Sequence, residues 1–389
     1  MSTTEMPPSL SDPIHSGNVN CHECDTKVEI PRLAHRQKAK CPCCGKVLFR
    51  HVNDAQQRIA IFATSALVFL LMAMPFNFLG FSANGQEHAI GIISGLDVLI
   101  TNDYLFLAVI QLLSIVVVPA IVLIGILLVL WANKKQHNAR FSKFALDIVF
   151  ALIPWSMAEI FLIGVLVSLI KISSLADVSI GLSFYAYIGF TICMVATMLS
   201  MDKHQLYTTI TKTKPPHKHL SKSESIQRTW ALLLTSILLY IPANTLPIMH
   251  TKFLGTNEPS TILGGVVVLW QSKSYPIALI IFIASIVVPV GKIVILVWLN
   301  YSVQKGTVKR QSERIFCYRL TEFIGRWSMV DVFVVAVLVS LIQLGNTMSV
   351  LPGPAALAFC SVVILTMLAA MSFDPRLIWS NTDAQNDKQ

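Results

Sequence analysis

The sequence predicts an all-α polytopic membrane protein with two tandem, parallel four-helix transmembrane repeats behind a small N-terminal domain. Three observations predict this fold class: the composition, a series of long apolar stretches and an internal repeat. Of the 389 residues, 54% are hydrophobic and only 13% are charged, about half the charged share of an average soluble domain. The composition therefore argues against a soluble enzyme and against a disordered chain.

The apolar stretches predict eight membrane spans, because about 20 helical residues cross roughly 30 Å of hydrocarbon. The predicted spans are residues 59–79, 105–131, 148–170, 182–200, 230–248, 277–299, 329–344 and 355–371. The third is interrupted near Pro154. Two apolar pieces, 89–100 and 261–270, are too short to span, and we expect interfacial or extracytoplasmic structure there, including short strands.

Four prolines recur in pairs along these spans. Pro75 and Pro242 occupy matching places, as do Pro119 and Pro289. Proline lacks the N–H that an α-helix needs, so each pair is expected to mark helix kinks or ends.

The basic residues predict the orientation of the chain. Of the 30 lysines and arginines, 26 lie in the tails and in the loops on one side of the predicted spans. Basic residues collect on the cytoplasmic side of membrane proteins, so both termini are expected in the cytoplasm. The net charge of +9 is therefore explained by topology, and no nucleic-acid binding is expected.

The two halves of the chain resemble each other. Trp155-Ser156-Met157 recurs 172 residues later as Trp327-Ser328-Met329, and the stretch 165–170 recurs unchanged as 337–342. Each unit has an even number of spans, so the two units share one orientation and form a parallel repeat.

The repeat and the polar segments divide the chain into five parts. The expected boundaries are a tail at 1–57 that holds a small domain at about 20–50, a first unit at 58–207, a basic linker at 208–227, a second unit at 228–380 and a polar tail at 381–389.

Four cysteines in the N-terminal tail form two pairs with metal-ligand spacing. Cys21 and Cys24 make the first pair, and sixteen residues later Cys41 and Cys44 make the second, with Cys43 left over. Two such pairs at this separation are a strong signal for a zinc ribbon. Four thiolates leave no open coordination position, so one structural zinc ion is expected.

These features together resemble the paraquat-inducible protein A family. The family pattern W-S-M-x-[D/E]-x-F is most complete in the second unit, which also carries Pro352-Gly353 and the stretch 373–379. The resemblance covers about residues 20 to 380. It implies an inner-membrane protein that passes phospholipid to or from a periplasmic tunnel partner with MCE domains. Larger members carry a second ribbon before the second unit, whereas the linker here has only His204, His217 and His219, which are expected to be solvated.

Ionisable residues inside spans are costly and are therefore candidates for function. Lys292 and Asp331 are predicted at similar depth, where they are able to pair. Glu159 is the counterpart of Asp331 in the first unit, whereas Val122 replaces Lys292 there. Further candidates for a polar patch in the bundle interior are Ser156, Ser328, Asn77 and Asn244. A role in transport and a purely structural ion pair both remain open for Lys292 and Asp331.

No catalytic motif appears in the sequence. There is no P-loop pattern for ATP and no H-E-x-x-H metal motif, so a non-enzyme is expected. Two alternatives to lipid transport remain open. One is a proton-coupled transporter of a small solute that uses Asp331 and Glu159, and the other is a membrane scaffold that does not transport.

Overall fold

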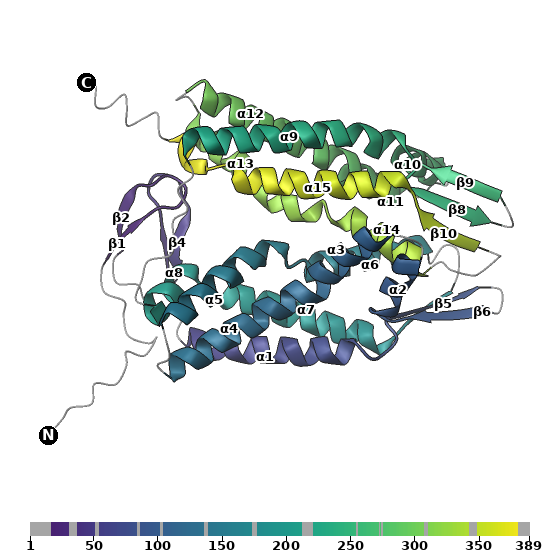
Figure 1. Cartoon of the computed structure of the whole chain (residues 1–389), viewed down its shortest axis with the longest axis horizontal. Helices are drawn as coiled ribbons and strands as arrows, with labels where there is room; N and C mark the ends of the chain where they lie inside the picture. The colour runs from purple at the N-terminus through teal and green to yellow at the C-terminus, as the bar shows by residue number, and fades with distance from the viewer. Residues whose placement is uncertain are drawn as a thin grey trace.

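The protein consists of two bundles of long helices that lie side by side, with a small β-domain at one end and two small sheets at the other (Figure 1). The computed structural model describes residues 17–30, 37–50, 54–83, 86–101, 104–135, 139–172, 177–211, 221–253, 256–271, 273, 275–306, 310–341 and 348–379. We call the end with the β-domain the ribbon end and the opposite end the sheet end. Both units place their strands at the sheet end, as a parallel repeat requires.

The N-terminal β-domain, which we call the ribbon, consists of two antiparallel hairpins. The first pairs β1 (Gly17–Asn20) with β2 (Lys27–Ile30), and the second pairs β3 (Lys38–Lys40) with β4 (Val47–Arg50). Each hairpin turns at one cysteine pair. In the second turn Gly45 has a φ of 71°, a left-handed conformation that glycine adopts without strain.

The first unit runs from α1 to a short π-helical segment at the ribbon end. Its elements are α1 (Ala55–Ala73), β5 (Leu79–Ala83), β6 (Gln86–Ile90), α2 (Ser94–Thr101), α3 (Leu105–Leu112), η1 (Leu113–Val117), α4 (Val118–Lys134), α5 (Ala139–Leu152), η2 (Ile153–Trp155), α6 (Ala158–Ile172), β7 (Asp177–Ile180), α7 (Leu182–Ser200), α8 (Lys203–Leu206) and η3 (Tyr207–Thr211).

The second unit repeats this order. Its elements are α9 (Lys222–Thr245), β8 (Met249–Phe253), β9 (Thr256–Ser260), α10 (Ile262–Gln271), α11 (Tyr275–Phe282), η4 (Ile283–Val287), α12 (Val288–Gln304), α13 (Gln311–Trp327), α14 (Val330–Leu341), β10 (Met348–Pro352), α15 (Pro354–Ser372) and η5 (Pro375–Ile378).

Eight helical stretches in the described part of the chain are long and apolar enough to cross a membrane. The predicted fold class, two tandem four-span repeats behind a four-cysteine ribbon, is thereby confirmed. Two predicted boundaries are wrong, because the third span begins at Ala139 and the seventh at Gln311. The seventh has 30 residues and is roughly 45 Å long at 1.5 Å per residue. Its first half, α13, carries charged residues that hid it from a search for apolar stretches.

The two short apolar pieces are mainly helical, which corrects the expectation of strands there. They form α2 and α10, each preceded by a strand, β6 or β9. The strands belong to two three-stranded antiparallel sheets with the orders β6-β5-β7 and β10-β8-β9. Each sheet therefore pairs a hairpin after the first span of a unit with the strand before its last span.

A glycine joins the last strand of each unit to its last helix. In the second unit the chain passes from β10 through Gly353 into α15, and the Gly353 N–H donates to the Ile248 carbonyl at 2.8 Å. A Cβ atom at Gly353 would overlap the backbone carbonyl of Pro247. Gly181 approaches the carbonyl of Asn77 in the same way in the first unit. Only glycine permits this close crossing, which packs α15 against α9 and α7 against α1.

The prolines at the second and sixth spans follow π-helical turns rather than simple kinks. Pro119 is the second residue after η1, and Pro289 is the second residue after η4. Pro119 has no N–H to give to the Ile115 carbonyl, and the Tyr187 hydroxyl donates to that carbonyl at 3.3 Å instead. The Ser114 carbonyl accepts from the Met157 N–H at 3.2 Å. The backbone groups that the π turn frees thus bind neighbouring helices.

The two units meet through the helices that carry the repeated motif. α6 of the first unit packs on α14 of the second, and the rings of Phe161 and Phe333 meet edge to face with centroids 5.6 Å apart. An aromatic pair of this geometry contributes about 0.5–1.5 kcal/mol beyond its buried area. The Ser340 hydroxyl also donates to the Gly95 carbonyl of α2 at 3.1 Å. α14 is therefore enclosed by both units.

Candidate functional site

The ribbon brings the four predicted metal ligands together. The Sγ atoms of Cys21, Cys24, Cys41 and Cys44 all lie within 4.8 Å of one another. Cys21 Sγ lies 3.4 Å from Cys44 Sγ, and Cys24 Sγ lies 3.4 Å from Cys41 Sγ. Four sulfurs around a tetrahedral zinc ion at about 2.3 Å are separated by roughly 3.8 Å. The donor set and its spacing therefore fit such an ion, and Cys43 is exposed outside the set.

Two of the four thiols, Cys21 and Cys44, are hard to ionise in the absence of a cation. Burial raises the pKa of Cys21 to about 11 and raises that of Cys44 further. Burial also opposes ionisation of Cys24, but hydrogen bonds from Thr26 outweigh it and lower the pKa of Cys24 to about 7. Thiolates in this buried cluster repel one another unless a cation compensates their charge, and a coordinating metal deprotonates such thiols outright.

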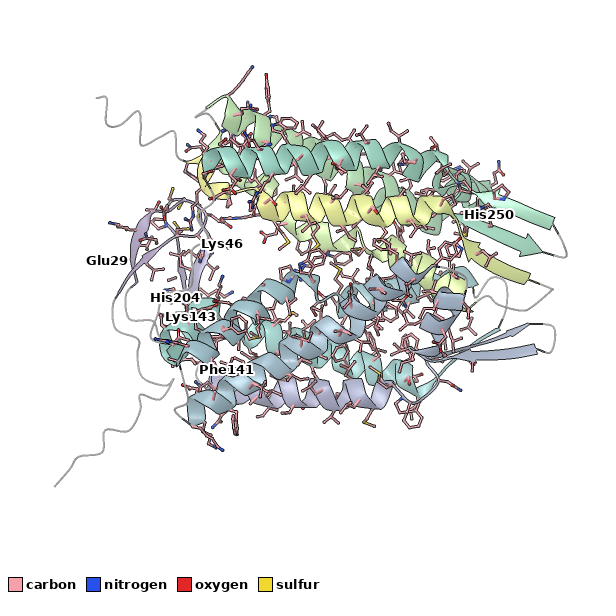
Figure 2. All side chains as sticks on the ribbon, viewed as in Figure 1. Glu29, Lys46, Phe141, Lys143, His204 and His250 are labelled. Atoms are coloured by element: carbon pink, nitrogen blue, oxygen red, sulfur yellow. The ribbon has the colours of Figure 1, made fainter. Side chains whose placement is uncertain are left out.

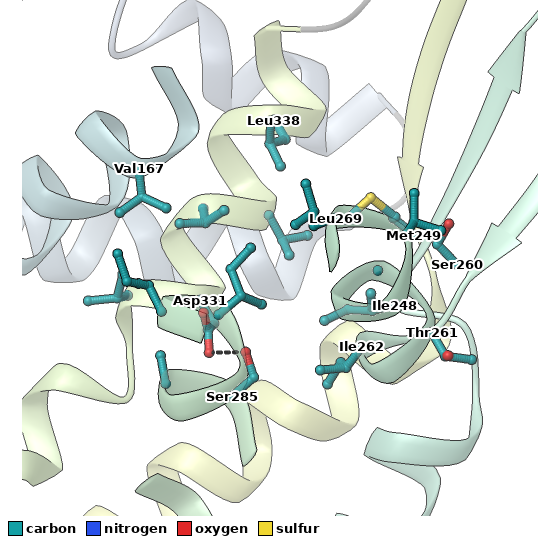
Figure 3. Close-up of a pocket in the computed structure, with 18 of the residues that line it drawn as sticks. Val167, Ile248, Met249, Ser260, Thr261, Ile262, Leu269, Ser285, Asp331 and Leu338 are labelled. Carbon is teal, nitrogen blue, oxygen red and sulfur yellow. Dashed lines mark hydrogen bonds between the residues drawn. The ribbon is translucent and has the colours of Figure 1, made fainter. Parts of the chain in front are cut away.

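A second site is a cavity in the second unit, shown in Figure 3. Its volume is about 270 Å³, and its walls come from α10, α11, η4 and α14, with Val167 of α6 and the adjacent ends of β8 and β9. Most of the lining is apolar. Asp331 and Ser285 form a polar group at the wall made by α14 and η4. Such a cavity accommodates a long apolar group that has a polar group at one end.

Asp331 is held by the π-helical turn of the sixth span. The Ser285 hydroxyl donates to Asp331 Oδ2 at 2.6 Å (Figure 3). Ser285 belongs to η4 and Asp331 to the first turn of α14. We did not single out Ser285 as a functional residue from the sequence. Its match with Ser114 in the repeat is the signal that identifies it.

Lys292 and Asp331 do not form the ion pair that the sequence left open. The Lys292 ammonium is buried and donates to Thr366 Oγ1 on α15 at 3.0 Å. The expectation of similar depth is wrong because the seventh span begins at Gln311 and not near Met329. Asp331 therefore lies at the level of Ser285, seven residues or about 10 Å along the helix from Lys292. Thr366 is a second residue that sequence analysis missed.

Glu159 pairs with an arginine of the other unit. Arg326 Nη1 lies 3.5 Å from Glu159 Oε1, where α13 of the second unit meets α6 of the first. The other oxygen, Glu159 Oε2, has no hydrogen-bond partner within the described ranges, nor do the buried hydroxyls of Ser156 and Ser328. Buried polar atoms without a hydrogen-bond partner are unusual inside a membrane protein, so these residues stay candidates for function.

The two asparagines lie outside any interior polar patch. Asn77 is exposed beyond the sheet end of α1. Asn244 is half-buried, and its amide donates to the Tyr240 carbonyl one turn earlier in α9 at 2.9 Å. Both expectations were therefore wrong, because the first and fifth spans end near these residues and place them at the sheet end.

The chain resembles known proteins over nearly its whole length. The profile of the family described as "Paraquat-inducible protein A" matches residues 56–211 and again 226–383. The chain is 39% identical to "Intermembrane transport protein PqiA" of Escherichia coli K12, over 93% of this chain and 95% of that one. It is 28% identical to "Lipophilic envelope-spanning tunnel protein A" of the same organism, over 94% and 92%. It is 26% identical to "Probable intermembrane transport protein" of Haemophilus influenzae, over 94% and 97%. No solved structure matches the chain.

Proposed function

Because the chain belongs to the paraquat-inducible protein A family, we propose that it is the inner-membrane component of an MCE-type lipid transport system. It passes phospholipid to or from a periplasmic tunnel protein with MCE domains. The names of its relatives, which are transport proteins rather than enzymes, support this proposal. The same names speak against a scaffold that does not transport.

The observation that carries the proposal is the cavity in the second unit. A phospholipid combines long acyl chains with a polar headgroup, and the cavity combines apolar walls with one half-buried carboxyl, that of Asp331. The walls include helices of the membrane spans together with strand ends at the sheet end. A lipid in this place has contact with both the bilayer and the region beyond it.

The proposal predicts that filling the cavity removes its lipid. Gly265 on α10 lines the cavity, and a Cβ atom there meets open space. Gly265→Leu should lower the amount of phospholipid that copurifies with the chain about tenfold or more, because steric conflict with a ligand costs about 1–3 kcal/mol. Mass spectrometry of extracted lipid measures this.

Gly291→Leu is the matched control, since Gly291 on α12 also faces open space but lies outside the cavity lining. Equal phospholipid in the two variants and the parent chain would contradict the cavity as the lipid site. Copurification of a polar solute in place of lipid would instead favour the solute transporter.

We propose that the ion of the ribbon is zinc, one per chain, bound by Cys21, Cys24, Cys41 and Cys44. The tetrahedral sulfur set supports zinc. Metal analysis of the purified chain should give about one zinc ion, and Cys21→Ser should lose it while the helical spans still insert, since the spans have a large hydrophobic core of their own. Two tightly held ions would show that a second site exists elsewhere.

We propose that the ribbon end faces the cytoplasm and that the sheet end faces the periplasm. Figure 2 shows Lys46 of the ribbon, Lys143 and His204 at the ribbon end, whereas His250 lies at the opposite end. Basic residues favour the cytoplasmic side. A cysteine introduced at Gly345, between α14 and β10, should then react with an impermeant thiol reagent from the periplasm. Reaction only after the inner membrane is opened contradicts this orientation.

A further inference from the structure

The ribbon precedes the first unit in the sequence, yet its polar anchors lie on the second unit. Arg319 of α13 donates from Nε to Glu23 Oε2 at 3.0 Å and from Nη2 to the Cys44 carbonyl at 2.8 Å. Arg376 of η5 donates to the His22 carbonyl at 3.2 Å. The ring of Trp379 packs against the cysteine cluster. The ribbon also reaches the first unit, because β4 contacts α8.

Glu23 links the metal site to this contact. It lies between the ligands Cys21 and Cys24, it is buried, and it also pairs with Lys46 of the second hairpin at 2.8 Å. One carboxylate therefore joins both hairpins of the ribbon to α13.

The repeat explains why the anchors lie on the second unit. The offset of 172 residues places Asp147 of α5 where the second unit has Arg319, and His204 where it has Arg376. Asp147 accepts a hydrogen bond from Tyr207, the counterpart of Trp379. In the first unit this position is thus closed by an internal contact, and the negative charge of Asp147 would repel Glu23 if the ribbon docked there. The second unit carries the opposite charge in an equivalent place.

We propose that the metal-loaded ribbon is a clasp that holds the ribbon ends of the two units together. Arg319 and Arg376 determine its docking on the second unit, and loss of the metal releases it. Release of the ribbon frees α13. This helix is the first half of the span that continues into α14 and carries Asp331 at the cavity. The proposal rests on the proposed zinc ion but not on lipid as the cargo.

The test uses the full chain in lipid nanodiscs, with zinc content and hydrogen–deuterium exchange as readouts. Removing zinc from the parent chain with a chelator should increase exchange in the ribbon and also in residues 311–323 and 375–379. Arg319→Asp, which introduces the residue of the first unit, should keep one zinc ion per chain. It should increase exchange in 311–323 and release zinc to the chelator at least about tenfold faster, because a hydrogen bond to a charged group contributes about that factor.

Three further variants keep the test decisive. Arg319→Lys retains the charge but loses the forked geometry, so its zinc should leave at an intermediate rate. Arg228→Ala removes an exposed arginine that pairs with Glu224 on α9 and should release zinc at the parental rate. If Arg319→Asp does not accumulate, Arg376→Ala serves in its place. The clasp proposal is overturned if hydrogen exchange in 311–323 does not change after zinc removal. It is also overturned if both Arg319→Asp and Arg376→Ala release zinc at the parental rate. If the parent chain holds no zinc before the chelator is added, the zinc proposal is contradicted instead.

Discussion

Asp331→Asn should reduce lipid transfer by about ten- to a hundredfold while the chain stays folded. Asparagine has the shape of aspartate, and its amide oxygen still accepts the hydrogen bond that Ser285 donates at 2.6 Å. The variant loses the carboxylate that a lipid headgroup or a proton would bind in the cavity. A hydrogen bond to a charged group contributes about 1.5–3 kcal/mol, which corresponds to this range of rates. Transfer of labelled phospholipid from proteoliposomes that contain the proposed MCE-domain partner measures the effect.

Asp97→Asn is the matched control for Asp331→Asn. Asp97 is an exposed carboxylate on α2 of the first unit, and it lies outside this cavity. It should transfer lipid at the parental rate. Parental transfer by Asp331→Asn, at equal abundance and thermal stability, would leave Asp331 with a structural role only. Since Lys292 binds Thr366 and not Asp331, substitutions of the two charged residues should act almost independently.

Gly353→Ala should destabilise the second unit strongly, although it adds only one methyl group. The new Cβ atom would overlap the Pro247 carbonyl, and that oxygen belongs to the backbone and cannot rotate away. Overpacking of this kind costs about 1–3 kcal/mol and sometimes more. We expect the thermal midpoint of the purified chain to fall by several degrees, and the contact of α15 with α9 to loosen.

The control for Gly353→Ala is Gly291→Ala. Gly291 lies inside α12, and a methyl group added there would have no neighbouring heavy atom within 4 Å in the described part of the chain. Alanine should therefore be neutral or should stabilise the helix by up to about 1 kcal/mol. If Gly353→Ala has the same thermal midpoint as the parent chain, the close approach of Gly353 to the Pro247 carbonyl does not limit stability.

The repeat and the cysteine pairs were readable from the sequence because they depend on the order of residues alone. Trp155-Ser156-Met157 and Trp327-Ser328-Met329 placed two like helices in matching positions, and the structure packs these helices, α6 and α14, against each other. The spacing of Cys21, Cys24, Cys41 and Cys44 likewise identified the cluster before any fold was known.

Depth in the membrane was not readable from the sequence, because it depends on which charges the fold buries or pairs. Arg314 lies inside the seventh span with only 3% of its surface exposed, and Arg319 is bound by the ribbon. A search for apolar stretches stops at such residues and starts the helix at residue 329 rather than at 311, which is 18 residues too late. The error moved Asp331 to the level of Lys292 and concealed Ser285 as its partner.

The π-helical turn at Ile283–Val287 sets the rotational phase of the sixth span. In an uninterrupted α-helix, residues seven apart lie within about 20° of the same face, so Ser285 and Lys292 would meet the same neighbour. Here the π turn interrupts this regular phase. Ser285 donates to Asp331 on α14, and Lys292 donates to Thr366 on α15 and lies beside Gly325 of α13. Shortening the turn by one residue would rotate α11 by about 100° relative to α12. The single extra residue therefore works as a fixed angular offset that aligns one wall of the cavity with Asp331.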